Sequence, residues 1–509
     1  MWETIVENIT IINDKLNGIV WGIPILVLII VTGVYITVRT GFFQVRRAKT
    51  VSNETFLAIF KKKSVSRSSD KKAISQFQAL STALAATIGT GNIAGVATAI
   101  AVGGPGAVFW MWISAFFGMM TNYAENVLGI YYRKRNAQNE WSGGAMYYIE
   151  EGFARKHGLK IIGKVLAVMF AVFCVLASFG IGNMTQVNSI AVSLKSALNI
   201  PPLMTGIVLA VLAGLVIIGG IKRIGKITEK LVPFMAVAYV AATVAIVIMD
   251  YKAIPMVFGQ IFKGAFGWTA VSGGISGMLM KQAVTMGFKR GVFSNEAGLG
   301  SSVMVHAASD VKEPVIQGMW GIFEVFFDTM IVCTLTAFTI LSTGVLGMTD
   351  ASGKLLEGVD LVTVAFSEVF HSSAGILLSL AILLFAFSTV LGWSFYGVKS
   401  LEYLFGEKAA KIYRFLFVVF IVVGATMDLG LAWTISDTLN GMMAIPNLIG
   451  VLVLSGTVFQ ITKNYSARKL SKKRKNITPM VSAYPDIQRK HAAEILVEEA
   501  SVRSARRRR

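Results

Sequence analysis

The stretch that decides the fold is Ala85-Ala86-Thr87-Ile88-Gly89-Thr90-Gly91-Asn92-Ile93-Ala94-Gly95, which lies inside an apolar run at residues 74–101. A glycine inside a helix costs about 1 kcal/mol relative to alanine. Backbone that leaves the helix at membrane depth persists only where protein or a cavity satisfies its polar groups. We therefore predict a transmembrane helix that is interrupted near Gly89 to Asn92. The alternative is a close contact between continuous helices through their small residues.

The whole chain has the composition of a membrane protein. Its 509 residues are 54% hydrophobic and only 15% charged, whereas about a quarter of an ordinary soluble chain is charged. A run of about 20 apolar residues crosses a bilayer, and we predict about eleven such spans. They cover residues 19–38, 74–101, 107–132, 161–194, 203–220, 231–249, 268–288, 315–342, 374–398, 412–426 and 433–461.

The net charge of +20 reports the orientation of these spans in the lipid bilayer. Lysine and arginine cluster in alternate loops and after residue 462, and basic loops face the cytoplasm. We therefore predict a multi-pass protein of the plasma (inner) membrane with its N-terminus outside and its C-terminus in the cytoplasm. Because topology accounts for the charge, nucleic acid is not expected as a partner.

The spans divide into one extra helix and two halves. Acidic residues precede the first span, so we read it as a retained helix, not a cleaved leader. The remaining ten fit two five-helix halves, which are inverted because five is odd. The predicted divisions are 1–45 for the N-terminal segment with the first span, 46–73 for a basic cytoplasmic loop, 74–250 and 251–462 for the two halves, and 463–509 for a disordered cytoplasmic tail.

A second glycine-rich motif opens the second half. It reads Gly273-Gly274-Ile275-Ser276-Gly277, and corresponding interruptions in two halves indicate a transporter's binding site. We predict a second break there, with Gly274 and Gly277 near the ligand. At such breaks free N–H groups and the positive helix end favour a carboxylate, while free carbonyls favour a cation.

Four motifs carry a family resemblance that covers almost the whole chain except the tail. They are the stretch at 85–95, Gly103-Gly104-Pro105-Gly106-Ala107, Lys289-Arg290-Gly291-Val292-Phe293-Ser294-Asn295-Glu296-Ala297-Gly298 and Asp437-Thr438-Leu439-Asn440-Gly441. They resemble the alanine/glycine:cation symporter family.

The resemblance implies an all-α, LeuT-type fold of five plus five inverted helices and symport of alanine or glycine with Na⁺ or H⁺. It implies no organic cofactor and no enzymatic activity. Some relatives are associated with glutamine, so a glutamine-preferring carrier is an alternative. A passive channel is a more remote one, since it would need a polar ring repeated around an axis. Against an intramembrane enzyme, His157, His306 and His371 are scattered and form no metal-binding pattern.

Analogy with LeuT-type carriers predicts a sodium site of five oxygens. The carbonyls of Ala85, Ile88 and Phe385 would join the hydroxyls of Ser388 and Thr389. Hard cations take oxygen ligands, and a neutral cage holds a monovalent ion without trapping it. The alternative is that both hydroxyls only bond back to carbonyls of the preceding helical turn.

The same analogy predicts the groups that bind the amino acid. The backbone of Thr90 and Gly91 would take the carboxylate, and the Asn92 amide would face the ion or the amino group. Trp393 follows Thr389 by one helical turn and so shares its face. We predict that Trp393 covers the pocket, with ordinary packing as the alternative.

A polar stripe is predicted from Phe179, Asn183 and Gln186, which recur at helical spacing. This spacing favours one face that contacts the substrate. Polar amides inside a span also hydrogen-bond neighbouring helices, and this is the alternative.

Two charged residues lie inside predicted spans. Asp328 needs a cation, a proton or a basic partner. Lys281 could pair with Asp328, extend toward the membrane surface, or stand in for a bound cation. The sequence does not choose among these, and it predicts no oligomeric state.

Overall fold

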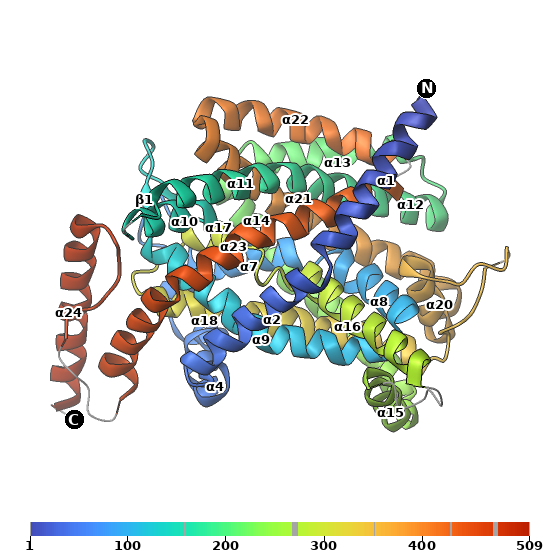
Figure 1. Cartoon of the computed structure of the whole chain (residues 1–509), viewed down its shortest axis with the longest axis horizontal. Helices are drawn as coiled ribbons and strands as arrows, with labels where there is room; N and C mark the ends of the chain where they lie inside the picture. Colours follow the sequence, from blue (N-terminus) through green and yellow to red (C-terminus); the bar gives the residue numbers. More distant parts are fainter. Residues whose placement is uncertain are drawn as a thin grey trace.

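The computed structural model describes residues 2–156, 158–266, 273–350, 352–427, 430–471 and 477–507, and most of them are helical (Figure 1). The N-terminal part holds α1 (Trp2–Val20), α2 (Ile23–Arg39), α3 (Phe43–Arg46), α4 (Ala48–Glu54), α5 (Phe56–Lys61) and α6 (Lys63–Ser66). The first half holds α7 (Gln76–Thr87), η1 (Gly91–Gly95), α8 (Val96–Gly103), α9 (Gly106–Tyr131), β1 (Lys134–Arg135), β2 (Trp141–Ser142), α10 (Ala145–Ala154), α11 (Lys160–Phe179), η2 (Gly180–Met184), α12 (Thr185–Leu198), α13 (Pro202–Ile217) and α14 (Gly220–Met249).

The second half has a similar make-up. It holds η3 (Tyr251–Ala253), α15 (Ile254–Ala265), α16 (Gly273–Asn295), α17 (Val303–Ala307), α18 (Pro314–Val325), η4 (Phe326–Cys333), α19 (Thr334–Ser342), α20 (Gly358–Phe370), η5 (His371–Ser373), α21 (Ala374–Phe405), α22 (Glu407–Thr426) and α23 (Gly430–Tyr465). The chain ends with η6 (Ser466–Leu470) and α24 (Pro485–Arg507). The two short strands form an antiparallel hairpin.

Within the described residues, every predicted span coincides with a helix or with consecutive helical segments; residues 268–272 of the seventh predicted span lie outside them. In the described part of the chain, 7 helical stretches are long and apolar enough to cross a membrane, and the bent pair α7 and α8 makes an eighth. The other three predicted spans stay predictions; they coincide with α13, a shorter apolar helix, and with α9 and α16, which are 26 and 23 residues long. A helix of about 20 residues crosses the hydrocarbon layer, so these lengths suffice.

The two halves begin with broken helices that run antiparallel. The N-terminal piece of the first, α7, contacts the C-terminal piece of the second, α17, while α8 contacts α16. The backbone also joins them, because the Ile74 N–H donates to the Ala308 carbonyl (3.1 Å) and the Asp310 N–H donates to the Ile74 carbonyl (2.7 Å). Inverted repeats require this antiparallel arrangement of corresponding helices.

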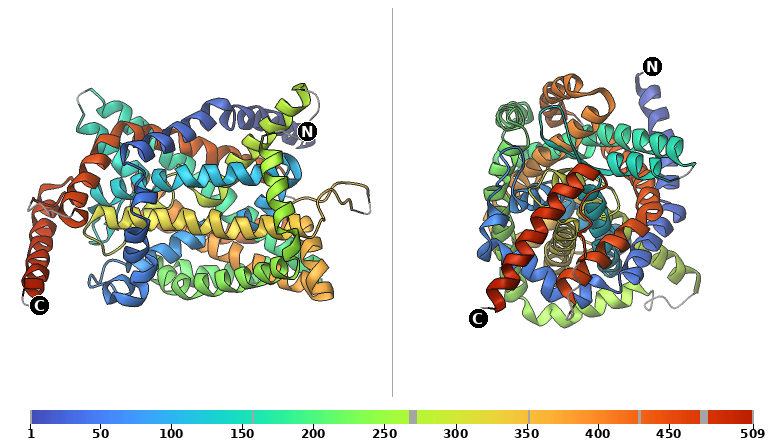
Figure 2. Two further views of the ribbon diagram at one scale, coloured as in Figure 1. Left: turned by 90° about the horizontal axis from the view of Figure 1, so that it is seen from below. Right: turned by 90° about the vertical axis from the view of Figure 1, so that its left-hand side faces the viewer.

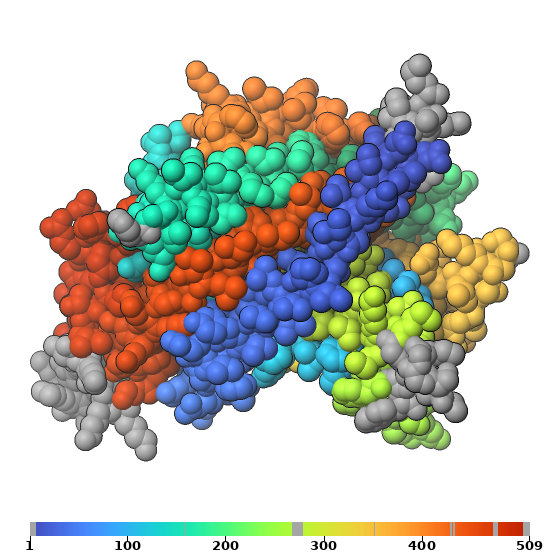
Figure 3. Space-filling model, in the orientation of Figure 1, coloured from blue at the N-terminus to red at the C-terminus, as the bar shows by residue number. Residues whose placement is uncertain are grey.

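The extra N-terminal helix lies on the outside of the bundle. Figure 3 shows α1 and α2 in blue, running diagonally beside α23 in red. Contacts join α1 to α23, and α2 to both α9 and α23. The indole of Trp21 donates to the Asp437 carbonyl (2.9 Å), which fixes the joint between α1 and α2 against α23.

Two of the connections contain helices that the sequence analysis did not predict. The segment 46–73 is not a plain loop, because it contains α4, α5 and α6. The tail is not wholly disordered, because η6 continues α23 and α24 lies across the end of the bundle (Figure 2). The basic composition suggested a solvated tail, but specific acidic partners bind several of its charges.

Arg468 anchors the tail. Its side chain is 1% exposed and its guanidinium bonds Glu313 (2.6 Å) and Glu499 of α24 (2.7 Å). Lys312 pairs with Glu494 of α24 (2.7 Å). A buried charge is stable only when it is paired and hydrogen-bonded, so these pairs account for the ordered helix.

Replacing Glu313 by alanine is expected to destabilise the fold. Removing one partner of a buried ion pair costs about 3–5 kcal/mol, and the remaining Glu499 should keep the loss near the lower value. Thermal unfolding of the purified variant measures the change. Glu357→Ala is the matched control, because the pair of Glu357 with Lys354 is largely exposed and such pairs contribute little. Equal melting temperatures for the two variants would contradict the anchor.

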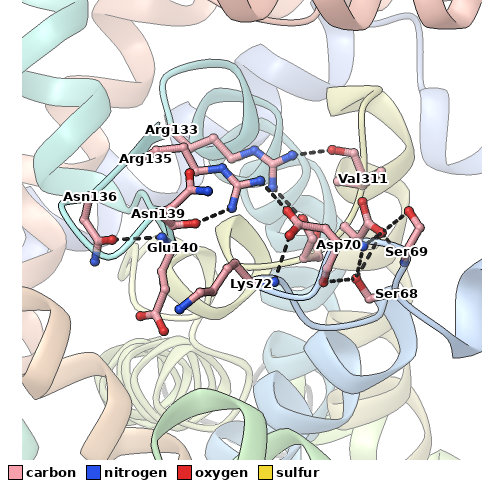
Figure 4. Close-up of polar contacts among 12 residues, drawn as sticks. Ser68, Ser69, Asp70, Lys72, Arg133, Arg135, Asn136, Asn139, Glu140 and Val311 are labelled. Atoms are coloured by element: carbon pink, nitrogen blue, oxygen red, sulfur yellow. Dashed lines mark hydrogen bonds and ion pairs between the residues drawn. The ribbon is translucent and has the colours of Figure 1, made fainter.

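A polar network ties the two broken helices together at one end of the bundle (Figure 4). The Asp310 carboxylate, after α17, accepts from the backbone N–H of Ser69 (2.7 Å) and of Asp70 (3.1 Å). Arg135 pairs with Asp70, and Arg133 donates to the carbonyl of Val311. Burial alone would raise the pKa of Asp310, but its hydrogen bonds outweigh burial and lower this pKa. Asp310 is therefore ionised at neutral pH and holds the segment before α7.

Candidate functional site

The first break lies where the sequence predicted it. α7 ends at Thr87, the helix resumes through the π-helix η1, and the two pieces are bent by 52°. The Gly89 N–H donates to the Asn92 Oδ1 atom (3.0 Å), and the Thr90 N–H donates to Gln186 Oε1 (3.4 Å). Side chains thus satisfy backbone groups that the interruption frees, as a membrane interior requires.

The second break is not at the predicted glycines. Gly274 and Gly277 lie at the start of α16, which continues to Asn295. Over the described residues 273–307 the chain leaves the helix between α16 and α17, where Glu296, Gly298 and Gly300 have φ of 56°, 92° and 73°. Gly277 is roughly 28 Å along the helix from that point, at 1.5 Å per residue. The predicted break is therefore corrected to residues 296–302, and Gly274 and Gly277 lie in α16, away from it.

Four of the five predicted cation ligands converge beside the first break. The Ser388 hydroxyl lies 3.2 Å from the Ala85 carbonyl and 2.8 Å from the Phe385 carbonyl. The Thr389 hydroxyl lies 3.1 Å from each of these two carbonyls. The hydroxyls bond back to Phe385, as the alternative predicted, but they also reach across to α7. Ile88 is buried at the break itself.

Glycine at position 89 lets α21 approach the break closely. A Cβ atom there would lie 2.5 Å from the Thr389 hydroxyl oxygen and 3.3 Å from Gln186 Oε1. The Gln186 amide also donates to the Ile181 carbonyl (2.9 Å). Three elements, α7, α12 and α21, therefore bring polar atoms to one point.

The predicted polar stripe is split by a π-helix. Phe179 packs on Tyr413, Phe417 and Phe420 of α22, and the Asn183 amide donates to the Phe417 carbonyl (2.7 Å). These two residues face α22, so they correspond to the helix-contact alternative and not to the site. The wider turn of η2 changes the register between Asn183 and Gln186, and only Gln186 faces the break.

Trp393 is buried against the same π-helix. A Cβ atom on Gly182 would lie 2.3 Å from the Trp393 Cβ atom, and the Trp393 ring contacts the Tyr396 ring at 5.3 Å between centroids. Trp393 follows Thr389 on α21, so it borders the site from the side of η2. Whether it covers a bound solute stays a prediction.

Asp328 is held by neutral donors, not by a lysine. Its fully buried carboxylate accepts from Asn92 (2.7 Å), Ser294 (2.9 Å) and Thr329 (2.8 Å). Lys281 is exposed on α16, roughly 20 Å along that helix from Ser294, at 1.5 Å per residue. Of the three alternatives for Lys281, the pair with Asp328 is therefore excluded. Asp328 instead orients Asn92, which in turn binds Gly89.

Sequence reasoning missed an ion-pair cluster on the N-terminal side of the second break. Asp437 of α23 pairs with Lys289 (2.9 Å) and Arg290 (3.5 Å) of α16. One turn further along α16, the Phe293 ring stacks on the Trp433 ring at 6.2 Å between centroids. The same ring lies 3.1 Å from the Cβ position of Gly91. Gly91 and Phe293 belong to two of the four motifs that carry the family resemblance. These motifs meet at the first break although they are far apart in the sequence, so the sequence analysis did not predict the contact.

Asn440 is a further candidate site residue that the sequence analysis did not predict. It follows Ser436 by one turn of α23, and Ser436 touches Gly180 of η2, so Asn440 faces the same interior side. Both polar atoms of the Asn440 amide are buried without a hydrogen-bond partner in the described part of the chain, as is the hydroxyl of Thr90. Unpaired buried polar groups are rare, which makes Asn440 and Thr90 candidates for contact with a bound solute.

Inverted broken helices, with carbonyl and hydroxyl oxygens gathered between the first break and α21, are the architecture of a secondary transporter of the LeuT fold. The structure is similar to the crystal structure of MhsT in complex with L-phenylalanine, with a TM-score of 0.52 at 13% identity over 85% of this chain and 98% of that chain. The chain belongs to the sodium:alanine symporter family, whose sequence profile matches residues 6–479. The predicted family, fold class and non-enzymatic nature are thereby confirmed, and the protein is a multi-pass membrane transporter.

Two similar proteins are named for different amino acids. The sodium/alanine symporter AgcS of Methanococcus maripaludis is 47% identical over 456 residues, which cover 89% of this chain and 96% of that protein. The probable sodium/glutamine symporter GlnT of Bacillus subtilis is 36% identical, over 89% of this chain and 90% of that protein. The family and both relatives agree on amino-acid symport, so the chain is an amino-acid symporter.

Proposed function

We propose that the protein carries a small neutral amino acid, alanine or glycine, into the cell together with Na⁺. The observation that carries this proposal is the convergence of the Ala85 and Phe385 carbonyls with the hydroxyls of Ser388 and Thr389. These neutral oxygens suit a hard monovalent cation. With the Ile88 carbonyl they would complete the predicted set of five.

The amino acid would bind directly beside this cation. Its carboxylate would meet the backbone at Thr90 and Gly91, near the positive end of the second half-helix. The unpaired Thr90 hydroxyl and Asn440 amide are available to it. Phe293 lies against Gly91 and Trp393 against Gly182, which favours a small side chain. The name of AgcS supports alanine, while that of GlnT keeps glutamine as the alternative.

Two polar clusters would act as the gates of alternating access. On the proposed outer side, Asp437 binds Lys289 and Arg290 of α16. On the proposed cytoplasmic side, Asp70 binds Arg135 and Asp310 binds the segment before α7. The chain ends lie at opposite ends of the bundle (Figure 1), which supports the predicted placement of the two termini on opposite sides of the membrane. Each gate would open while the other stays closed.

The ion gradient would supply enough energy for uptake. A single cation that moves through about 100 mV releases roughly 2.3 kcal/mol. A tenfold concentration gradient adds about 1.4 kcal/mol. Together these support accumulation on the order of several hundred-fold.

Counterflow of labelled alanine in proteoliposomes tests the proposal. We expect exchange that requires sodium, that unlabelled alanine or glycine inhibits, and that a pH gradient alone does not drive. Inhibition by glutamine but not by alanine would favour the glutamine alternative. Exchange without any cation dependence would contradict symport and favour a passive pathway.

A further inference from the structure

A basic cavity lies where α2 and α23 end side by side. Its volume is about 390 Å³, and it is lined by the turn after α2, the start of α3 and the last turns of α23. Four of its ten lining residues are positively charged, and none of the ten is acidic. The four are Arg39, Arg46, Arg47 and Lys463. A cleft lined by one sign of charge concentrates ions of the opposite sign.

These four charges are not used to hold the fold together. Within the described residues, none of the four side chains makes a hydrogen bond or an ion pair. The contrast is Arg468, one turn beyond the cavity, whose guanidinium binds the carboxylates of Glu313 (2.6 Å) and Glu499 (2.7 Å). Because the charges in the cavity have no such partners, they are available to a ligand.

Local structure directs two of these side chains to the cavity. The Arg39 guanidinium lies 5.0 Å from the centre of the Phe459 ring of α23 and 5.9 Å from that of the Tyr35 ring, and such cation–π contacts hold it between the two helices. Gly41 has a φ of 67°, and its Cβ position is 3.3 Å from the Arg46 Nη1 atom. The turn therefore brings Arg46 back toward the end of α2.

The types of side chain indicate which anion fits. An arginine guanidinium is a planar fork that matches the oxygens of a phosphate group in pairs, and a lysine adds a compact positive charge. Three arginines and a lysine around one cavity therefore favour a phosphate group. This chemistry is shared by a free phosphate ion and by the headgroup of a phospholipid.

The neighbouring surface of α2 favours the lipid as the source. Val27, Val31, Tyr35 and Val38 recur at helical spacing and are 49%, 50%, 37% and 55% exposed. This apolar face leads to the cavity, because Tyr35 lies beside Arg39. The predicted orientation places this end of α2 at the cytoplasmic leaflet, and basic pockets between transmembrane helices on that side bind anionic headgroups.

We propose that this cavity binds the phosphate group of an anionic phospholipid, whose acyl chains lie along the exposed face of α2. The phosphate oxygens accept hydrogen bonds from the three arginines and the lysine that line the cavity. One lipid molecule would thereby join the extra N-terminal helix to α23, which Figure 3 shows beside it. The site is separate from the cation site at Thr389 and does not rest on the proposed function.

Native mass spectrometry of the purified full chain, which counts bound lipids, tests the site without transport. The probes are phosphatidylglycerol and phosphatidylcholine with the same acyl chains, which share the phosphodiester and differ in net charge. We expect tighter binding of phosphatidylglycerol. The double variant Arg46→Gln, Arg47→Gln should bind it roughly 30-fold more weakly, since each basic residue near an anionic lipid contributes about fivefold.

Two further double variants make the comparison specific. Lys408→Gln with Lys411→Gln removes the same charge from exposed positions of α22, outside the cavity, and should bind phosphatidylglycerol like wild type. Arg46→Lys with Arg47→Lys keeps the charge and should retain most of the affinity. All of these positions are exposed, where substitutions change folding stability little.

The outcomes decide between the cavity, the general positive surface and a soluble ion. Equal affinity for the two lipids, or unchanged binding in the Arg46→Gln, Arg47→Gln variant, would overturn the inference. Equal loss in the Lys408→Gln, Lys411→Gln variant would also overturn it, because binding would then follow the surface charge as a whole. Inorganic phosphate, which has no acyl chains, should displace the lipid only in large excess, and displacement at equal concentration would assign the cavity to a soluble anion.

The inference and the proposed function can fail separately. Lipid binding is measured without sodium or amino acid, so a protein that binds phosphatidylglycerol as expected but transports no alanine would contradict only the proposed function. Sodium-dependent alanine transport by a protein that does not distinguish the two lipids would contradict only the lipid site.

Discussion

Alanine in place of Thr389 is expected to lower the apparent sodium affinity of transport by roughly 10- to 150-fold. The Thr389 hydroxyl lies 3.1 Å from both the Ala85 and the Phe385 carbonyl, and it is 2% exposed, so no solvent replaces it. The loss of one polar contact to a charged group costs about 1.5–3 kcal/mol, and each 1.4 kcal/mol is about tenfold. Sodium titrations of alanine uptake in proteoliposomes measure the effect.

The same helix offers a matched control. The Ser394 hydroxyl is buried on α21 and donates to the Leu391 carbonyl of its own helix (2.7 Å). Ser394→Ala should therefore keep the wild-type sodium dependence, and Thr389→Ser should restore most of it. Wild-type sodium dependence in Thr389→Ala would remove this residue from the cation site.

The substitution Gly89→Ala should reduce amino-acid binding by roughly 5- to 150-fold. The added methyl group would lie 2.5 Å from the Thr389 hydroxyl and 3.3 Å from Gln186 Oε1. The first distance is too short for any real contact, so α21 or the break must move. Such overpacking costs about 1–3 kcal/mol. Binding of labelled alanine to the purified variant in sodium measures the loss directly.

A second glycine in the same motif serves as the control. The only neighbour of a Cβ atom on Gly95 would be the Arg290 Cδ atom, at 4.0 Å. Gly95→Ala adds the same group to the same helix without filling the site, so it should bind alanine like wild type. If both variants lost binding equally, the defect would come from the helix and not from the site between Gly89 and Thr389.

Local sequence signals predicted the spans and the first break well. Apolar length set the spans, and the glycines at 89 and 91 lie where α7 ends and η1 begins. The second break was misplaced because glycines near the start of α16 were weighed above Gly298 and Gly300. A glycine matters most where φ is positive, as it is at those two positions.

The remaining errors involve contacts between distant residues or a change of helical register. The stripe of Phe179, Asn183 and Gln186 assumes a regular helix, and the π-helix η2 between them invalidates that assumption. The ordered tail depends on Arg468 and Glu313, which are 155 residues apart. Composition alone cannot reveal such a partner.

An experimental structure of the protein with sodium and alanine bound tests the central claim most directly. We predict a cation among the Ala85 and Phe385 carbonyls and the Ser388 and Thr389 hydroxyls, with the alanine carboxylate at the backbone of Thr90 and Gly91. An uninterrupted helix through residues 85–95, or a ligand bound elsewhere while packed side chains fill this position, would contradict the account.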